Sequence, residues 1–229
     1  REMRERGQAL RAIRLDSGDL AFFAHRARAM LDAAGFPEVK IAASNQLDEF
    51  VIRSLREQGA PIDIFGVGTS LVTGAPDAAL DGVYKLAEAG DEARIKVSES
   101  LGKTTLPGRK QVHRFSNGDG QFAGIDGVVT LNEAVPARLI HPFEPHKSLT
   151  CADLASEPLL QPVMRRGQRV AAGRSVEDIR AFAAKRLALL PPEYRRFENP
   201  HTYKIGISET LHRERETLRQ RYAARRSLE

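Results

Sequence analysis

Apolar positions along the first third of the chain alternate between short runs and helical spacing. After Asp19 they follow the i, i+3, i+4, i+7 pattern of an amphipathic helix: Leu20, Phe23, Ala24, Ala27, Leu31 and Ala34. A second helix is predicted to begin at Asn45, a favourable N-cap residue, with these residues facing inward: Leu47, Phe50, Val51 and Leu55. Short, mostly apolar segments at 12–13, 39–42 and 62–65 precede polar turns. Strand starts therefore recur about every 25 residues, the spacing of βα units in a parallel sheet or barrel.

The helical period disappears after Pro76. Short strand-like runs follow, separated by Gly, Asp and Asn, at 82–86, 94–98, 110–115, 127–131 and 137–140. Charged helical segments are predicted at 175–190 and from Ser208 to the end. We therefore predict an α/β protein in three parts: βα units of a partial barrel at 1–76, a β-rich subdomain at 77–147 and a helical C-terminal region at 148–229. Three βα units cannot close a barrel of eight, so either the sheet is open or further strands lie outside this sequence.

Composition narrows the class of partner. The 229 residues contain no apolar run near the ~18 residues that span a bilayer, and no signal peptide, so no membrane association is expected. The single cysteine, Cys151, is interpreted as a small apolar filler in a reducing, cytoplasmic compartment. The net charge of +5 comes from Arg interspersed with Glu, which is typical of solvated helix faces and argues against nucleic acid. The excess of cations suits a small anionic ligand.

Polar and glycine-rich turns follow each of the first three predicted strands. In α/β proteins the carboxyl ends of parallel strands form the ligand site. The three turns carry the candidate residues Arg14 and Asp16, then Ser44 and Asn45, then Gly68 and Thr69. Together they predict a site for a phosphorylated, hydroxyl-rich ligand.

Arg14 and Asp16 alternate with Leu15 at a strand end, so both are expected on one face. Either they form a mutual ion pair, or they bind a ligand through the guanidinium fork and the carboxylate; we favour the ligand. The sequence from Gly66 through Gly68 lets the backbone approach a phosphate, although strand-to-loop turns use glycine routinely.

Other polar groups carry weaker signals. The six histidines show neither metal-ligand spacing nor a nucleophile motif, so we predict no catalytic residue and no metal site in this chain. The basic segment from Lys103 to Lys110 either forms a solvated hairpin or reaches over a polyanionic ligand.

Several motifs together resemble the nicotinate phosphoribosyltransferase family. They are IRLDSGDL at 13–20, ASN at 43–45, IFGVGTSLVT at 64–73, GVYKL at 82–86, the stretch 96–110, and two later segments at 199–203 and 207–211. The likeness covers nearly the whole chain in order, and it corresponds to the C-terminal half of that family only.

The resemblance implies an enzyme that makes nicotinate mononucleotide from nicotinate and phosphoribosyl pyrophosphate, coupled to ATP hydrolysis, for NAD synthesis. It implies the irregular (β/α) barrel of type II phosphoribosyltransferases, with Mg²⁺ on pyrophosphate. Arg14 would lie beside the nicotinate carboxylate and Asp16 near the ribose, while the 5′-phosphate would be held by Ser44, Asn45, Gly68 and Thr69.

In that family the phosphorylated histidine and a ring-stacking aromatic lie upstream of the matching region. We therefore expect this chain alone to be inactive and to work as a homodimer or with a complementing chain. Two alternatives stay open: a non-catalytic phosphoribosyl-binding fragment that needs a partner chain, and a nicotinamide-using phosphoribosyltransferase. Thr69-Ser70 and the Leu-Pro-Gly at 106–108 favour the nicotinate branch.

Overall fold

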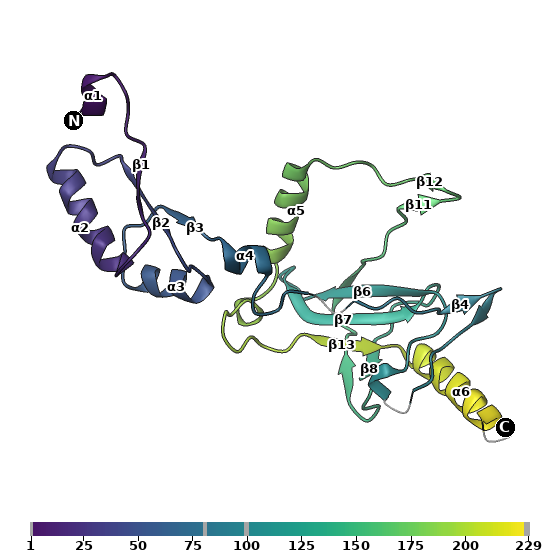
Figure 1. The fold of residues 1–229 in the computed structure, drawn as a ribbon. Helices are drawn as coiled ribbons and strands as arrows, with labels where there is room; N and C mark the ends of the chain where they lie inside the picture. The colour runs from purple at the N-terminus through teal and green to yellow at the C-terminus, as the bar shows by residue number, and fades with distance from the viewer. Residues whose placement is uncertain (1, 80–81, 99–100, 227–229) are drawn as a thin grey trace. The chain divides into compact units, whose positions relative to one another are not determined.

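The chain forms two compact units, Arg1–Val83 and Tyr84–Glu229 (Figure 1). The computed structural model describes residues 2–79, 82–98 and 101–226. Each unit is built on its own sheet. The predicted α/β class is confirmed, since both units combine strands with helices.

The first unit contains a parallel three-stranded sheet in the order β1-β2-β3. Figure 1 shows helices α2 and α3 alongside these strands. The elements in chain order are α1 (Glu2–Glu5), β1 (Ala12–Leu15), α2 (Leu20–Ala33), β2 (Lys40–Ser44), α3 (Glu49–Glu57), β3 (Ile64–Gly66) and α4 (Thr69–Thr73). The predicted succession of three strands and intervening helices is confirmed, whereas closure into a barrel stays a prediction.

Local capping fixes where the helices begin. Asp19 caps α2, since its carboxylate accepts a hydrogen bond from the Phe22 backbone N–H at 3.0 Å. Gly18 just before it has φ of +74°, and a Cβ there would lie 2.6 Å from the Phe23 ring. Gly18 and Asp19 therefore form the turn and the N-cap with which α2 begins.

The predicted start of the second helix at Asn45 is wrong. Asn45 and Gln46 both have positive φ, 86° and 45°, which takes the backbone out of the helical region. Asp48 is the N-cap instead, accepting from the Val51 N–H at 2.8 Å, and α3 begins at Glu49. A second good capping residue three positions later decided the boundary.

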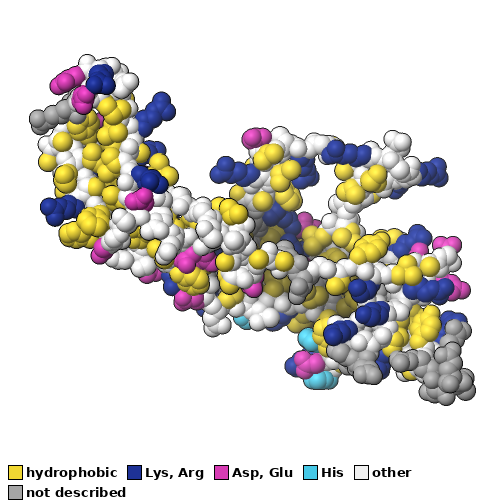
Figure 2. Space-filling model, in the orientation of Figure 1, with side chains coloured by type: hydrophobic (Ala, Val, Ile, Leu, Met, Phe, Trp, Pro, Cys, Tyr) yellow, Lys and Arg dark blue, Asp and Glu magenta, His cyan; other side chains and the backbone are white. Residues whose placement is uncertain are grey.

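The core of the first unit uses small residues on α2 and larger ones around α3. Its buried cluster consists of Ala21, Ala43, Leu47 and Leu55. Phe23 and Phe50, predicted to face inward, are roughly half exposed. Figure 2 shows hydrophobic side chains gathered on the visible face of this unit. The burial of Leu47 and Leu55 follows the predicted period, but alanines, not Phe23, pack α2 closely.

The second unit contains a six-stranded sheet in the order β10-β6-β7-β13-β8-β9, in which only β7 and β13 pair in parallel. The strands are β6 (Lys110–Ser116), β7 (Phe122–Thr130), β8 (Arg138–Ile140), β9 (Ser148–Thr150), β10 (Ala155–Pro158) and β13 (Lys204–Ile207). Two small hairpins are β4 (Glu88–Ala89) with β5 (Glu92–Ala93), and β11 (Met164–Arg165) with β12 (Gln168–Arg169). The helical elements are η1 (Leu101–Lys103), α5 (Val176–Ala188), η2 (Pro192–Tyr194) and α6 (Glu209–Arg226).

Two predicted strands are absent from the described residues. The segments 82–86 and 94–98 have no strand structure; the β4–β5 hairpin forms between them, around Gly90 and Asp91, which both have positive φ. The strands predicted at 110–115, 127–131 and 137–140 correspond to β6, β7 and β8, with β7 beginning earlier. Residues after 147 also add β9, β10 and β13 to this sheet.

The insertion of β13 between β7 and β8 depends on a glycine. A Cβ on Gly206 would lie 2.5 Å from Leu139 Cβ, closer than side chains can approach. The fully buried Leu139 therefore fills the space that Gly206 leaves, next to Phe115 and Cys151. Cys151 is buried, and burial raises the pKa of its thiol, so its interpretation as apolar filler is confirmed.

The last two helices begin where predicted. Ser175 and Asp178 form a capping box at the start of α5. Ser208 precedes α6, and its hydroxyl accepts from the Leu211 N–H and donates to Glu133 Oε2 at 2.6 Å. The final three residues of the predicted terminal helix, 227–229, lie outside the described residues. Across the described chain, no helix has both the length and the apolar character needed to cross a bilayer.

Candidate functional site

The carboxyl ends of β1, β2 and β3 bring the three predicted turns together. The register pairs Leu15 with Ala43 and Ser44 with Gly66, so the residues that follow each strand meet at one edge of the sheet. This arrangement follows from parallel pairing, because parallel strands present the same end to the same edge.

A hollow of about 700 Å³ lies at this edge, between the turn after β2 and the turn after β3. It is lined by Asn45, Gln46, Leu47, Asp48, Gly66, Gly68, Thr69 and Ser70. Three predicted residues, Asn45, Gly68 and Thr69, are therefore brought together. The sequence interpretation missed Gln46, Asp48 and Ser70 as lining residues, although each lies within three positions of a predicted one.

The other three predicted residues, Arg14, Asp16 and Ser44, are linked by hydrogen bonds beside the hollow. Arg14 Nη2 lies 2.9 Å from Asp16 Oδ2, and Arg14 Nη1 lies 3.4 Å from Ser44 Oγ. The side chains of Arg14 and Asp16 are 67% and 52% exposed. The ion pair considered as the structural alternative is thus present, but an exposed pair contributes only about 0–1 kcal/mol to stability. Both groups can therefore turn to a ligand at little energetic cost.

The glycines after β3 differ in what surrounds them. A Cβ on Gly66 would touch Ser44 Cβ at 3.4 Å, an ordinary contact. A Cβ on Gly68 would have no atom of the described residues within 4 Å. Packing therefore does not require glycine at 68, and its bare backbone leaves room for another molecule to approach.

The hollow suits recognition of a polar ligand more than acid–base chemistry. Its lining contains hydroxyl and amide groups but neither Lys, Arg nor His. The Asp48 carboxylate is occupied by the N-terminus of α3. An anion bound here would be held by hydroxyl and backbone groups, with Arg14 nearby as the cation.

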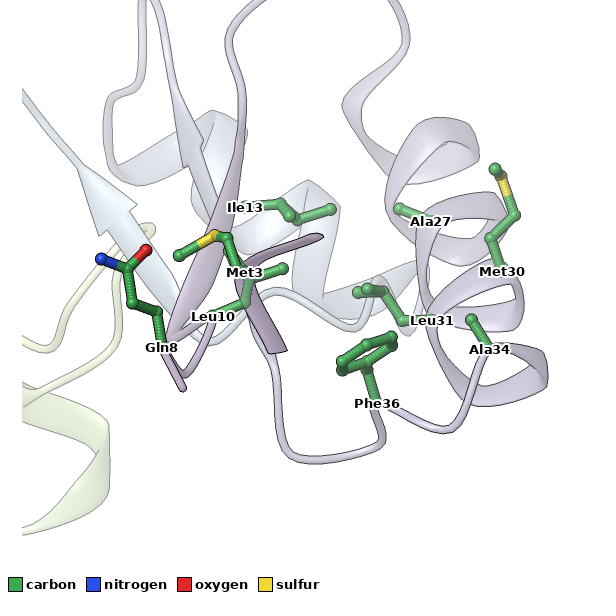
Figure 3. A pocket seen from close by; sticks show the side chains of 9 residues that line it. All are labelled: Met3, Gln8, Leu10, Ile13, Ala27, Met30, Leu31, Ala34 and Phe36. Atoms are coloured by element: carbon green, nitrogen blue, oxygen red, sulfur yellow. The ribbon is translucent and has the colours of Figure 1, made fainter. Parts of the chain in front are cut away.

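A second cavity in the first unit, of about 380 Å³, has a different character (Figure 3). It is lined by Met3, Gln8, Leu10, Ile13, Ala27, Met30, Leu31, Ala34 and Phe36. Gln8 is its one polar side chain, and Figure 3 shows it beside β1, away from the α2 residues. This lining does not suit an anion.

The basic segment at 103–110 uses two of its cations internally. Arg109 pairs with Glu88 at 2.6 Å. Lys110 Nζ donates to the Leu106 and Pro107 carbonyls at 3.0 and 3.1 Å and also to the Gly108 carbonyl, and burial lowers its pKa. These two side chains shape the loop, so a role over a ligand would rest on the exposed Lys103 and stays a prediction.

Among the described residues, no three or more His, Cys, Asp or Glu side chains come together as a candidate ion site. A metal that arrives on a ligand's own phosphates would not need such a cluster.

Comparison with known proteins identifies the relatives of this chain. Residues 109–215 match the family model described as the nicotinate phosphoribosyltransferase C-terminal domain. The chain is 37% identical over 205 residues to nicotinate phosphoribosyltransferase of Bacillus subtilis, covering 86% of this chain and 42% of that protein. It is 34% identical over 218 residues to the Homo sapiens protein of the same name, covering 90% and 40%.

Comparison with solved structures finds proteins with related names. The crystal structure of human nicotinic acid phosphoribosyltransferase matches with a TM-score of 0.73 and 30% identity, covering 93% of this chain and 41% of that one. Nicotinate-nucleotide pyrophosphorylase from Pyrococcus furiosus matches with a TM-score of 0.51 and 25% identity, covering 78% and 40%. The chain spans about two fifths of the length of the relatives it matches. The predicted resemblance is confirmed.

Proposed function

We propose that this chain, similar over most of its length to nicotinate phosphoribosyltransferases, is part of such an enzyme. The whole protein would join nicotinate to phosphoribosyl pyrophosphate, coupled to ATP hydrolysis, and release nicotinate mononucleotide and pyrophosphate. The observation that carries the proposal is the meeting of Arg14, Ser44 and the Asn45–Thr69 hollow at one edge of a parallel sheet.

Each predicted residue has a role suited to its place. Arg14 would pair with the nicotinate carboxylate, exchanging its exposed partner Asp16 for the ligand. Asp16 would then accept hydrogen bonds from ribose hydroxyls. The 5′-phosphate would occupy the hollow, contacting Ser44, Asn45, Gly68 and Thr69. The ribose would then lie between the Arg14–Asp16 pair and the hollow.

The proposed contribution of this chain is orientation and charge stabilisation. Displacement of pyrophosphate from the anomeric carbon passes through an oxocarbenium-like state, which an aligned pyridine nitrogen and nearby carboxylate favour. Mg²⁺, expected from the family, would be held mainly by pyrophosphate oxygens. The described residues offer it no protein cage.

Three further features belong to the proposal. The three parallel strands would be part of the irregular barrel of type II phosphoribosyltransferases, since β1 and β3 each have a single strand neighbour among the described residues. Further strands, from a longer chain or from a partner, would cover these edges. We also retain homodimer formation and a cytoplasmic location.

The alternatives receive less support. The matched relatives named above carry nicotinate or nicotinic acid in their names, which does not favour the nicotinamide-using branch. A non-catalytic phosphoribosyl-binding protein would use the same hollow. Turnover in an assay with nicotinate, phosphoribosyl pyrophosphate, ATP and Mg²⁺ would exclude this alternative, although we expect this polypeptide alone to be inactive. Turnover at a normal rate would contradict the expectation that the histidine chemistry lies elsewhere.

Binding of nicotinate mononucleotide tests the site directly. Calorimetry on the chain and on Arg14→Ala and Thr69→Ala should show a loss of about tenfold or more for each variant, because each removes a hydrogen bond to a charged group. Arg26→Ala is the matched control, since this exposed arginine lies on α2, outside the hollow.

Nicotinamide mononucleotide separates the two enzyme branches. It lacks the carboxylate, so the intact chain should bind it more weakly than nicotinate mononucleotide, and Arg14→Ala should abolish the difference. Equal binding by the intact chain, or unchanged binding in both site variants, would refute the proposed roles.

A further inference from the structure

The second unit contains a separate cavity of about 570 Å³ that the proposed reaction does not use. It lies between the turn joining β8 to β9 and the start of β13. Lining residues that bear on its chemistry are His141, Phe143, Lys147, His201, Lys204 and Ile205. Its volume falls within the range of about 300–1,000 Å³ that is usual for small-molecule sites.

Apolar groups supply a surface for a planar ring. Phe143 and Ile205 line the cavity and are 47% and 54% exposed, so part of each apolar side chain is accessible to a ligand. The His141 and Phe143 rings meet edge to face, with centroids 6.1 Å apart. A flat aromatic ligand can cover this surface and gain both burial and ring contact.

Two lysines in the lining of this cavity could bind an anionic group. Lys147 Nζ is 2.6 Å from Glu144, so this lysine is largely neutralised. Lys204 has no ion-pair partner among the described residues and lines the same cavity. His141 Nδ1 accepts from the Glu144 N–H at 3.0 Å, so its ring proton lies on Nε2 as a further donor. Lys204 is therefore the principal uncompensated charge.

The frame of the cavity is fixed before any ligand arrives. Tyr203, next to Lys204, donates its hydroxyl to Asp126 Oδ1 at 2.9 Å. The His201 N–H donates to the Glu193 carbonyl at 2.9 Å, and its ring packs on Tyr194. A site held by such contacts loses little entropy when it binds.

We propose that this cavity binds a nucleoside monophosphate, with the base on Phe143 and Ile205 and the phosphate at Lys204. The NPHTYK segment at 199–204, which the phosphoribosyl site leaves unexplained, thereby acquires a function: its Tyr203 fixes the wall and its Lys204 provides the charge.

AMP is the probe. Because AMP carries a ribose 5′-phosphate, it could also enter the hollow of the first unit, so calorimetric titrations use Arg14→Ala/Thr69→Ala as the background. On that background AMP should bind at one site, and Lys204→Ala and Phe143→Ala should each weaken binding at least about fivefold. Both residues are exposed, and an unchanged thermal melt verifies folding. Lys185→Ala, an exposed lysine of α5 outside the cavity, is the matched control and should bind like the background.

Two component ligands test both halves of the proposal. Adenosine, which lacks the phosphate, and inorganic phosphate, which lacks the base, should each bind more weakly than AMP. AMP binding that is absent on this background, or insensitive to Lys204→Ala and Phe143→Ala, overturns the proposal. Inorganic phosphate binding as tightly as AMP also overturns it, because the base would then contribute nothing.

Discussion

The two units each contain an Arg–Asp pair with the same shortest nitrogen–oxygen distance and opposite surroundings. Arg14 and Asp16 meet at 2.9 Å with side chains 67% and 52% exposed. Arg114 and Asp126 also meet at 2.9 Å, but their side chains are 27% and 13% exposed. Arg114 donates two hydrogen bonds to the Asp126 carboxylate, which also accepts one from the Tyr203 hydroxyl. Distance alone therefore does not distinguish an exposed pair from a buried one.

Burial decides how much each pair contributes to stability. Water competes with the exposed pair, so its charges stay available to a ligand at low cost. The Arg114–Asp126 pair is largely desolvated, and its hydrogen bond raises the pKa of the Arg114 guanidinium. The guanidinium also lies over the Phe122 and Tyr203 rings, 5.1 and 5.8 Å from their centroids. Losing one partner there leaves a charge without compensation.

The largest difference is expected from removing the carboxylate of each pair. Asp126→Ala should lower the free energy of unfolding by about 3 kcal/mol, because it leaves the Arg114 guanidinium and the Tyr203 hydroxyl without their hydrogen-bond acceptor. Asp16→Ala should lower it by less than about 1 kcal/mol. Denaturant unfolding followed by circular dichroism measures both. Similar losses in the two variants would mean that burial does not separate the pairs.

A smaller difference is expected between two glycines. Gly206→Ala places a methyl 2.5 Å from Leu139 Cβ and should destabilise the second unit by about 1–3 kcal/mol. Gly68→Ala meets no atom of the described residues within 4 Å and should change stability by less than about 0.5 kcal/mol, while weakening nicotinate mononucleotide binding. Gly68→Ala that preserves full ligand affinity would show that the phosphate does not approach this backbone.

A third difference is expected at high pH. Burial, with the hydrogen bond to Asp126, raises the pKa of Tyr203 to about 12 from its usual 10. The protonated form is favoured in the folded state, so its contribution is complete below pH 10 and is lost as pH rises toward 12. Tyr203→Phe should therefore lose less stability than the parent over this range. Tyr84→Phe, at a 98% exposed position, is the control and should follow the parent.

Several features followed from local sequence. The helical period after Asp19 correctly located α2, and the charged helix predicted at 175–190 corresponds to α5. Polar residues after the first three strands could be assigned to one edge because parallel strands align their carboxyl ends. Alternation at Arg14 and Asp16 placed both on one face, where they meet.

Other features could not be read locally. Asn45 and Asp48 are both good N-caps, and only the backbone course through Asn45 and Gln46 selected the second. Lys110 looked available for an anion, yet three backbone carbonyls occupy its ammonium group. The segments at 82–86 and 94–98 have strand-like composition, but pairing formed only at the two-residue strands between them.

The sequence by itself determined the βα succession of the first unit and the residue types offered at the strand ends, because these depend on neighbours within a few positions. Tertiary structure decided that β13 enters the sheet between β7 and β8, where the missing Cβ of Gly206 leaves room for Leu139. It also decided which Arg–Asp pair is buried and which is exposed. Both outcomes depend on desolvation and close packing between residues distant in sequence, which local spacing does not encode.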